Sequence, residues 1–376
     1  MPASGPRWMI GAVRRERDHG VHRVQADVAG HPLWFESADA ELEPSPEAFA
    51  SLLFLPALHH GATVEVDRPL DPVWLDGTRR LPVLLAAWWG YPDIYPVDAP
   101  ARTPAASTRA AAVAACFTGG VDSFYTLRTC GDRLSRLVFV HGYDMPLADR
   151  VRLASFARSL QAVSESVGKP ALVLRTNARE HPIVASVSWD RVHGAALAAA
   201  AHVLSGTIGG LIIPSSYGLS NIIPWGSHPE MDPLWSTSRV EILHDDARPN
   251  RQDKIRRIAG DPLAWRHLRV CWENRAPTGN CSACLKCVRT MAVISAYGRL
   301  TDFTVFDLSV PLAARFDAVE EIPPYLLKPC QGLLELDLAP DVRGAVVRLL
   351  DRSTPGLLRR VARRASRLAG RGGGEG

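Results

Sequence analysis

Residues 116–125 read Cys-Phe-Thr-Gly-Gly-Val-Asp-Ser-Phe-Tyr, and this stretch decides how the rest of the chain is interpreted. A run of small apolar residues, 110–116, precedes it, and a helix-compatible segment, 121–129, follows it. A strand, a glycine turn and a helix in this order leave several backbone N–H groups unpaired beside a helix N-terminus. Such a place binds phosphate, because the donors converge and the helix dipole favours negative charge. The stretch therefore predicts a phosphate site within an α/β fold.

The individual side chains of the loop suit this chemistry. Gly119 and Gly120 allow a ligand to approach the main chain closely. Thr118 and Ser123 add hydroxyl groups, and Asp122 is a candidate ligand for a magnesium ion that bridges phosphates. The loop lacks the Gly-Lys-Ser/Thr ending of a Walker A motif. An ordinary glycine turn between a strand and a helix is the alternative interpretation.

Length and composition indicate a globular protein with room for two domains. The 376 residues are 47% hydrophobic and 22% charged, and the formal charge of +4 is too small to argue for nucleic-acid binding. We expect no secretory signal and no membrane span, because no apolar run has the required length or position. With cysteine spacing that suits a reducing compartment, a cytoplasmic protein is expected.

From residue 110 onward, apolar strand patterns alternate with helical patterns, which is typical of a doubly wound parallel sheet. The expected strands are 111–117, 137–141, 171–175, 210–214 and 240–244. The expected helices between them are 121–129, 148–167 and 190–204.

Residues 1–105 are predicted to form a small, separate α+β module. Its expected strands are 8–13, 21–28, 32–36 and 62–66, and its expected helices are 46–55, stopped by Pro56, and 81–89. A linker rich in Pro, Ala, Thr and Ser, 96–109, would follow.

Polar residues follow several of the expected strands, where a parallel sheet of this kind binds its ligands. Topology would bring the Thr118 loop, residues 141–144, Asn177 and residues 215–217 to one edge. The candidates for substrate contact are His141, Tyr143, Asp144, Ser215 and Ser216, with Asp232 from the polar and aromatic segment 224–246. His141 and Asp144 are candidate acid–base groups, although a strand-end histidine and a turn aspartate explain them equally well.

Lys254 is a further candidate, because the chain has only four lysines and this one stands near the start of an expected helix, 250–259. A lysine there could contact a triphosphate as a point charge. A solvated helix face is the competing explanation.

Four cysteines form the second motif that carries chemistry: Cys271, Cys281, Cys284 and Cys287. Four thiolates complete a tetrahedral zinc site without an open position, so the site would be structural. An iron–sulfur cluster is the competing interpretation, since thiolates hold it as well.

The two motifs together resemble those of the 7-cyano-7-deazaguanine synthase family, which belongs to the PP-loop ATP pyrophosphatases. The PP-loop reads S-G-G-x-D-S, and residues 118–123 match it with Thr118 in place of the first serine. The resemblance covers about residues 110–300 and implies a Rossmann-like adenine nucleotide alpha hydrolase fold. The substrate-binding loops of the family are not matched in this sequence. In the family the PP-loop lies close to the N-terminus, whereas about 105 residues precede it here. A changed substrate is therefore expected.

The resemblance also implies the chemistry and the ligands. ATP would be bound by Thr118, Gly119, Gly120, Val121, Asp122 and Ser123, with Mg²⁺, and zinc by the four cysteines. Asp122, Ser123 and Lys254 would be the catalytic residues. The implied activity is that of an ATP-dependent ligase, which adenylates a carboxylate or carbonyl oxygen for attack by ammonia or an amine. The product would be an amide, a nitrile or a conjugate to a partner protein.

Two alternatives remain at this stage: a PP-loop enzyme that replaces oxygen by sulfur on tRNA or a small molecule, and a non-catalytic nucleotide-binding scaffold. Residues 301–340 are expected to pack against the sheet. Residues 341–368 predict an arginine-rich amphipathic helix, and the tail up to residue 376 is expected to be disordered. The basic helix leaves nucleic-acid binding open, and a homodimer also stays open.

Overall fold

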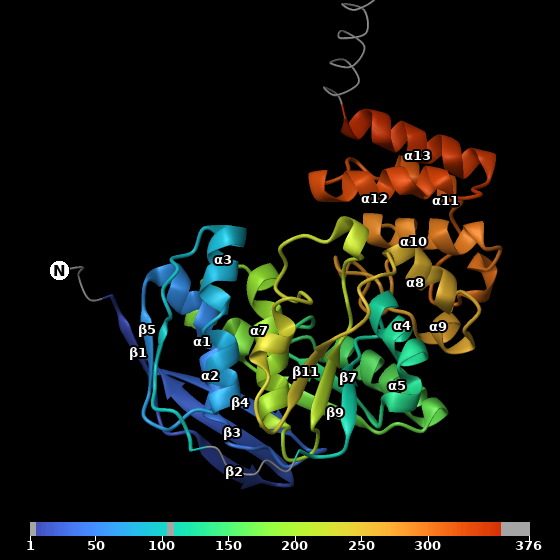
Figure 1. Ribbon diagram of the computed structural model, residues 1–376. Helices are drawn as coiled ribbons and strands as arrows, with labels where there is room; N and C mark the ends of the chain where they lie inside the picture. Colours follow the sequence, from blue (N-terminus) through green and yellow to red (C-terminus); the bar gives the residue numbers. More distant parts are fainter. Residues whose placement is uncertain (1–4, 104–108, 355–376) are drawn as a thin grey trace, which may run out of the picture. The chain divides into compact units, whose positions relative to one another are not determined.

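The computed structural model describes residues 5–103 and 109–354 (Figure 1). The chain divides into two compact units, Met1–Lys254 and Ile255–Gly376. The first unit has an α/β fold around a mostly parallel sheet, and the second carries the cysteine cluster. The structure therefore places the division near residue 254, whereas the sequence led us to expect one near residue 105.

Five parallel strands form the part of the sheet that follows residue 110. They are β7 (Val113–Cys116), β8 (Arg136–His141), β9 (Ala171–Thr176), β10 (Gly210–Ile213) and β11 (Glu241–His244). Their order is β11-β10-β7-β8-β9, and each adjacent pair is parallel. All five strands expected from the sequence are confirmed, because each contains a short apolar run between helical segments or loops.

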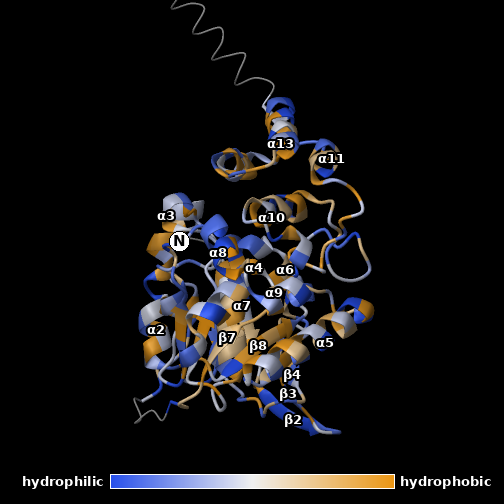
Figure 2. Cartoon of the chain, turned by 90° about the vertical axis from the view of Figure 1, so that its right-hand side faces the viewer, coloured by the Kyte–Doolittle hydropathy of each residue, from blue (hydrophilic) through white to orange (hydrophobic). Residues whose placement is uncertain are grey.

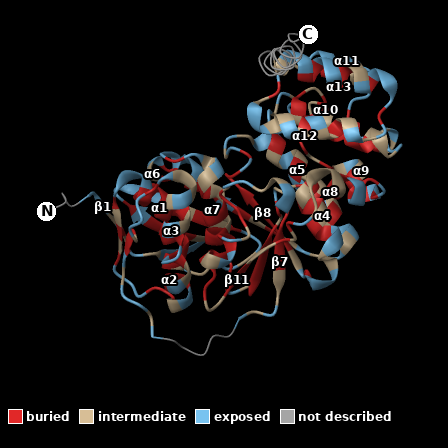
Figure 3. Ribbon diagram, turned by 45° about the horizontal axis from the view of Figure 1, so that its top comes forward, coloured by how far each residue is buried: buried red, intermediate tan, exposed pale blue. Residues whose placement is uncertain are grey.

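Helices cover both faces of these strands. Val138 and Val140 in β8 belong to the core shared with α1 (Pro46–His60) and α7 (Trp189–Val203). The intervening Phe139 instead packs against Phe156 of α5 (Arg150–Val167), with ring centroids 4.5 Å apart. Alternate side chains of a strand point to opposite faces, so both faces are apolar and covered. Figure 3 shows the resulting burial of the central strands.

The N-terminal strands continue this sheet instead of forming a separate module. They are β1 (Arg7–Ile10), β2 (Arg14–Asp18), β3 (Val21–Val28), β4 (His31–Ser37), β5 (Thr63–Val66) and β6 (Val97–Asp98). β4 pairs antiparallel with β9, with Phe35 opposite Thr176. β2 is hydrophilic and fully exposed, in contrast to the apolar central strands β7 and β8 (Figure 2).

Asn177 holds the junction between the two halves of the sheet. Its Oδ1 accepts a hydrogen bond from the Trp34 N–H at 3.0 Å, and its Nδ2 donates to the Pro32 carbonyl at 2.8 Å. We expected this residue at the ligand-binding edge, but its amide is engaged with β4. Pairing across 140 residues of sequence leaves no local signal, which explains why the sequence suggested a module of its own.

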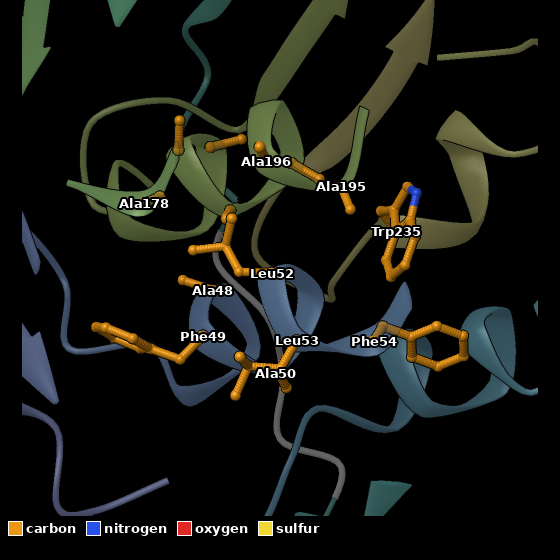
Figure 4. Packing of buried hydrophobic residues seen from close by; sticks show 14 of the residues in the cluster. Ala48, Phe49, Ala50, Leu52, Leu53, Phe54, Ala178, Ala195, Ala196 and Trp235 are labelled. Carbon is orange, nitrogen blue, oxygen red and sulfur yellow. The ribbon is translucent and has the colours of Figure 1, made fainter. Parts of the chain in front are cut away.

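Helix α1 is longer than expected, because it continues through Pro56 and ends at Gly61, whose φ is +61°. A proline inside a helix removes one backbone hydrogen bond and usually ends it. Here almost every residue of α1 before His59 is buried, and the helix packs against α7, with Leu52 facing Ala195 and Ala196 (Figure 4). This packing compensates for the lost bond. Helices α2 (Pro72–Thr78) and α3 (Leu81–Trp89) follow.

The second unit is helical. Helix α8 (Arg251–Ile258) crosses the division, and the helices beyond it are α9 (Pro262–His267), α10 (Leu285–Ala296), α11 (Leu312–Asp317), α12 (Leu327–Gln331) and α13 (Pro340–Ser353). Arg348 of α13 forms an ion pair with Asp317 of α11 at 2.7 Å. The arginine-rich segment expected to extend to residue 368 lies outside the described residues from 355 onward. None of the helices in the described ranges has the length and apolar character that crossing a membrane requires.

Candidate functional site

The glycine loop lies between β7 and α4 (Val121–Thr129), at the carboxyl edge of the parallel strands. The Phe117 N–H bonds to the Val138 carbonyl at 2.8 Å and ties the loop's first residue to the neighbouring strand. Gly119 has φ +72°, a left-handed conformation that strains residues with a Cβ. Gly120 is extended and precedes α4, whose N-terminus has no side-chain cap. The first-turn N–H groups of α4 are therefore available to an anion.

Two basic side chains of α8 reach back to the first turn of α4. Arg251 Nη1 lies 3.1 Å from Asp122 Oδ2, and Lys254 Nζ lies 3.4 Å from Asp122 Oδ1. The Asn250 side chain accepts hydrogen bonds from the N–H groups of Gln252 and Asp253 at 2.8 and 3.1 Å, which caps α8 and fixes its start. The structure thus brings together Asp122 and Lys254, two residues singled out from the sequence and 132 positions apart.

Lys254 is almost wholly buried, with 1% of its side chain exposed. Its ammonium group also donates to the Ser215 carbonyl and lies 5.6 Å from the centroid of the Tyr125 ring. A buried ammonium requires such partners, because leaving it without them costs several kcal/mol. Lys254 is therefore a fixed positive charge beside the loop, and the expectation of a merely solvated helix face does not hold for it.

Arg251 was not selected from the sequence, although it stands in the same basic run as Lys254. The arginine completes a cluster of one carboxylate and two cations at the start of α4. With two positive charges against one negative charge, the cluster carries a net positive charge. Such a cluster complements an anionic ligand.

The other hydroxyl groups of the loop are placed differently. Ser123 Oγ donates to the Gly120 carbonyl at 3.0 Å and is buried, so it stabilises the turn, while Thr118 is half-buried. On the next turn of α4, Thr126 donates to the buried carboxylate of Asp245, at the end of β11. Asp245 also accepts from Cys130 Sγ at 3.4 Å. Sequence reasoning noted Asp245 only as part of a polar segment.

Two of the residues expected to contact substrate are buried and engaged with the protein. Tyr143 donates its hydroxyl to the Ala196 carbonyl at 2.7 Å, and burial raises the pKa of this hydroxyl well above its usual value. His141 Nε2 lies 3.1 Å from the Pro146 carbonyl, and burial lowers the pKa of the ring. These contacts match the structural alternative, in which His141 supports a strand end.

The remaining candidates differ in exposure. Asp144 and Ser216 are exposed, whereas Ser215 is buried and donates to the Tyr217 carbonyl at 2.8 Å. Asp232 is fully buried and accepts from Ser227 Oγ and His244 Nδ1, each at 2.7 Å. These partners make Asp232 a support of the 227–244 segment. Asp144 and Ser216 are the two that remain accessible to a substrate.

The four cysteines of the second unit meet at one point, with all four sulfur atoms within 4.8 Å of one another. Cys271 and Cys284 sulfurs are 3.9 Å apart, as are those of Cys281 and Cys287. Tetrahedral zinc with Zn–S bonds of about 2.3 Å separates its sulfurs by about 3.8 Å, so the cluster is compatible with zinc.

Neighbouring groups favour the thiolate form of Cys284. This residue is at the N-cap position of α10, where the helix dipole favours a thiolate, and its N–H donates to Cys281 Sγ at 3.2 Å. A hydrogen bond from the Cys287 side chain lowers the pKa of Cys284 to about 5, while the same bond raises the pKa of Cys287.

Asn280 and Arg315 position the segments that carry the cysteines. Asn280 Oδ1 accepts from the N–H groups of Val270 and Cys271 at 2.8 and 3.1 Å, which places Cys271 next to the Cys281 turn. Arg315 Nη1 donates to the Ser282 carbonyl at 3.0 Å inside that turn. Second contacts of this kind orient metal ligands. Neither residue was selected from the sequence.

Comparison with protein-family models, curated proteins and solved structures gave no significant match to this chain.

Proposed function

We propose that this protein is an ATP pyrophosphatase of the PP-loop type, which activates an oxygen of an acceptor as its adenylate. The observation that carries the proposal is the meeting of Asp122, Lys254 and Arg251 at an uncapped helix start that follows a left-handed glycine. This combination offers N–H donors and a carboxylate for Mg²⁺ in the first turn of α4, with fixed positive charge from α8 beside them. Those are the groups that a nucleoside triphosphate with its metal needs.

The groups have distinct roles in the proposed reaction. The loop N–H groups and the first turn of α4 would hold phosphate oxygens, and Lys254 and Arg251 would offset the charge that develops on pyrophosphate as it leaves. An acceptor oxygen forms a bond to the α-phosphorus while the bond from that phosphorus to the bridging oxygen breaks. Ammonia or an amine then attacks the activated carbon, loses a proton and displaces AMP. The four cysteines would hold zinc as a structural ion that takes no part in these steps.

Sulfur transfer is the less favoured alternative, because the thiols near the loop in sequence are poor nucleophiles. Burial raises the pKa of Cys116, and burial followed by the charge of Asp245 raises the pKa of Cys130. A thiolate is the attacking species in such chemistry, and both environments disfavour it.

Calorimetric titration with α,β-methylene-ATP and Mg²⁺ tests the proposal. Lys254→Met is expected to weaken binding by about 10- to 100-fold, the loss typical of one charge-assisted hydrogen bond. The exposed Arg257, three positions further along α8, provides the control Arg257→Met, which should bind like the original protein. Equal affinity in all three proteins would contradict the proposal.

A further inference from the structure

A polar cavity lies in the first unit, at the opposite edge of the sheet from the glycine loop. Its volume is about 190 Å³. Ser205, which comes before β10, and Thr237 and Arg239, which come before β11, line it together with residues 43–47, Asp71, Arg102 and His202. The amino ends of the parallel strands therefore border this cavity, whereas the loop follows a carboxyl end. The two sites share no residue.

The cavity lies between two helix ends of opposite charge. The N-terminus of α1, with Ser45 as its flanking residue, contributes a partial positive charge, and the C-terminal turn of α7, which carries His202, contributes a partial negative charge. Both helices are 15 residues long. A ligand with charges of opposite sign at its two ends would match this polarity.

His202 is the group that points to a ligand. Its side chain is 1% exposed, and its Nε2 lies 2.8 Å from the Trp235 carbonyl, so this nitrogen carries the hydrogen. Burial lowers the pKa of the ring, which keeps it neutral, and Nδ1 then presents a lone pair. Nδ1 is buried and has no hydrogen-bond partner among the residues that the structure describes. An N–H group of a ligand would satisfy it.

Two arginines provide the opposite end. Arg102 Nη2 lies 2.8 Å from Glu47 Oε1, and Arg239 Nη1 lies 3.1 Å from Glu43 Oε2. About 40% of each guanidinium side chain is exposed, 42% for Arg102 and 41% for Arg239. A guanidinium has five N–H donors, so each arginine keeps donors for a carboxylate.

The charges of the lining agree with this division. Glu43, Glu47 and Asp71 supply three carboxylates. Arg15, whose Nη2 lies 3.5 Å from Glu43 Oε1, adds a third guanidinium group to the two arginines of the lining, so the surroundings are neutral, as a zwitterion is. Glu47 is buried and fully engaged, since it also accepts from Ser45 Oγ at 2.6 Å and from the Asp71 N–H at 2.8 Å. The walls are thus fixed before any ligand enters.

We infer that this cavity binds a small aminocarboxylate zwitterion of the size of a free amino acid. Its ammonium group faces His202 and the α7 end, and its carboxylate faces Arg102 and Arg239. The inference does not depend on the proposed function, because it concerns a different set of residues.

Calorimetric titration without nucleotide tests the inference, with glycine, L-serine and L-aspartate as probes and with acetate and methylammonium as ligands of one charge. We expect at least one amino acid to bind more tightly than both single-charge ligands. Arg239→Gln should weaken this binding by at least about tenfold, the loss of one charge-assisted contact. Arg7→Gln is the matched control, because Arg7 forms an exposed ion pair with Glu65 elsewhere in this unit and should bind normally.

Ser205→Leu places a larger side chain in the cavity and should abolish amino-acid binding while the protein keeps its far-UV circular dichroism spectrum and its cooperative unfolding in urea. If this variant does not fold, the comparison of Arg239→Gln with the original protein decides the matter. The inference is overturned if no amino acid binds, if methylammonium binds as tightly as the best amino acid, or if Arg239→Gln binds it normally.

Discussion

The pair of Asp122 and Lys254 gives the most informative stability experiment, because one partner is buried and the other is not. Removing Asp122 leaves Lys254, with 1% of its side chain exposed, with the Ser215 carbonyl, the Tyr125 ring and the charge of Asp246 as its remaining partners in the described part of the chain. Removing Lys254 leaves Asp122, which is 23% exposed and still paired with Arg251 at 3.1 Å. The two single substitutions should therefore have unequal effects.

The separation sets the scale of the effect. Two unit charges at 3.4 Å attract each other by about 5 kcal/mol at an effective dielectric constant of about 20. Solvent reaches Asp122 and screens part of this attraction, so we expect Asp122→Ala to lower the free energy of unfolding by about 1–3 kcal/mol. Lys254→Met should cost less than about 1 kcal/mol, because an apolar chain of similar length fills the same space.

Urea denaturation of the two single variants and the double variant measures their coupling. We expect the double variant to be more stable than Asp122→Ala alone, with a coupling energy of about 1–2 kcal/mol, since no unpaired buried cation remains. Additive effects of the two substitutions would refute the reasoning, and so would a larger loss from Lys254→Met than from Asp122→Ala.

Three further expectations follow from the same structure. Cys284→Ser should lose its metal, measured by elemental analysis, and unchanged metal content would argue against the cluster as the binding site. Asn280→Ala keeps all four ligands and should lower metal affinity by about 10- to 100-fold. Gly119→Ala should lower the free energy of unfolding, measured by urea denaturation, by about 1–2 kcal/mol, because Gly119 has a φ of +72°. Gly131→Ala is the control and should cost less, since a Cβ at Gly131 meets no atom within 4 Å. Equal losses in the two variants would contradict the assignment of strain to position 119. Burial lowers the pKa of five histidines of the first unit, namely His141, His181, His193, His202 and His228. The unfolded chain therefore binds more protons than the folded protein, and the free energy of unfolding should fall as the pH drops below about 6.5. A free energy of unfolding that stays constant between pH 7 and 5 would count against this expectation.

Local patterns were sufficient to predict the parallel half of the fold. The helix expected at 121–129 and the one at 81–89 have the observed bounds, because glycine residues or a proline mark their ends. The sequence also singled out the four cysteines by their spacing, Asp122 by the loop motif and Lys254 by the rarity of lysine, but it gave no sign that Asp122 and Lys254 form an ion pair.

The remaining features depend on contacts that sequence order hides. The antiparallel pairing of β4 with β9 joins the N-terminal strands and the parallel strands into one sheet. Packing against α7 stabilises α1 and allows this helix to continue beyond Pro56. Whether a candidate residue can contact a substrate depends on the orientation of its side chain more than on its position in the sequence. Tyr143 and Asp232 occupy the expected region but turn their polar groups to Ala196, Ser227 and His244, and no local pattern reports that choice.

The most direct test of the proposed function is identification of the products formed from Mg·ATP by ³¹P NMR, with ammonium and a set of small carboxylates present. The account predicts AMP and pyrophosphate in equal amounts, and loss of both in Asp122→Ala protein whose folding has been verified. Formation of ADP and phosphate, or unchanged ATP with every acceptor, would contradict it.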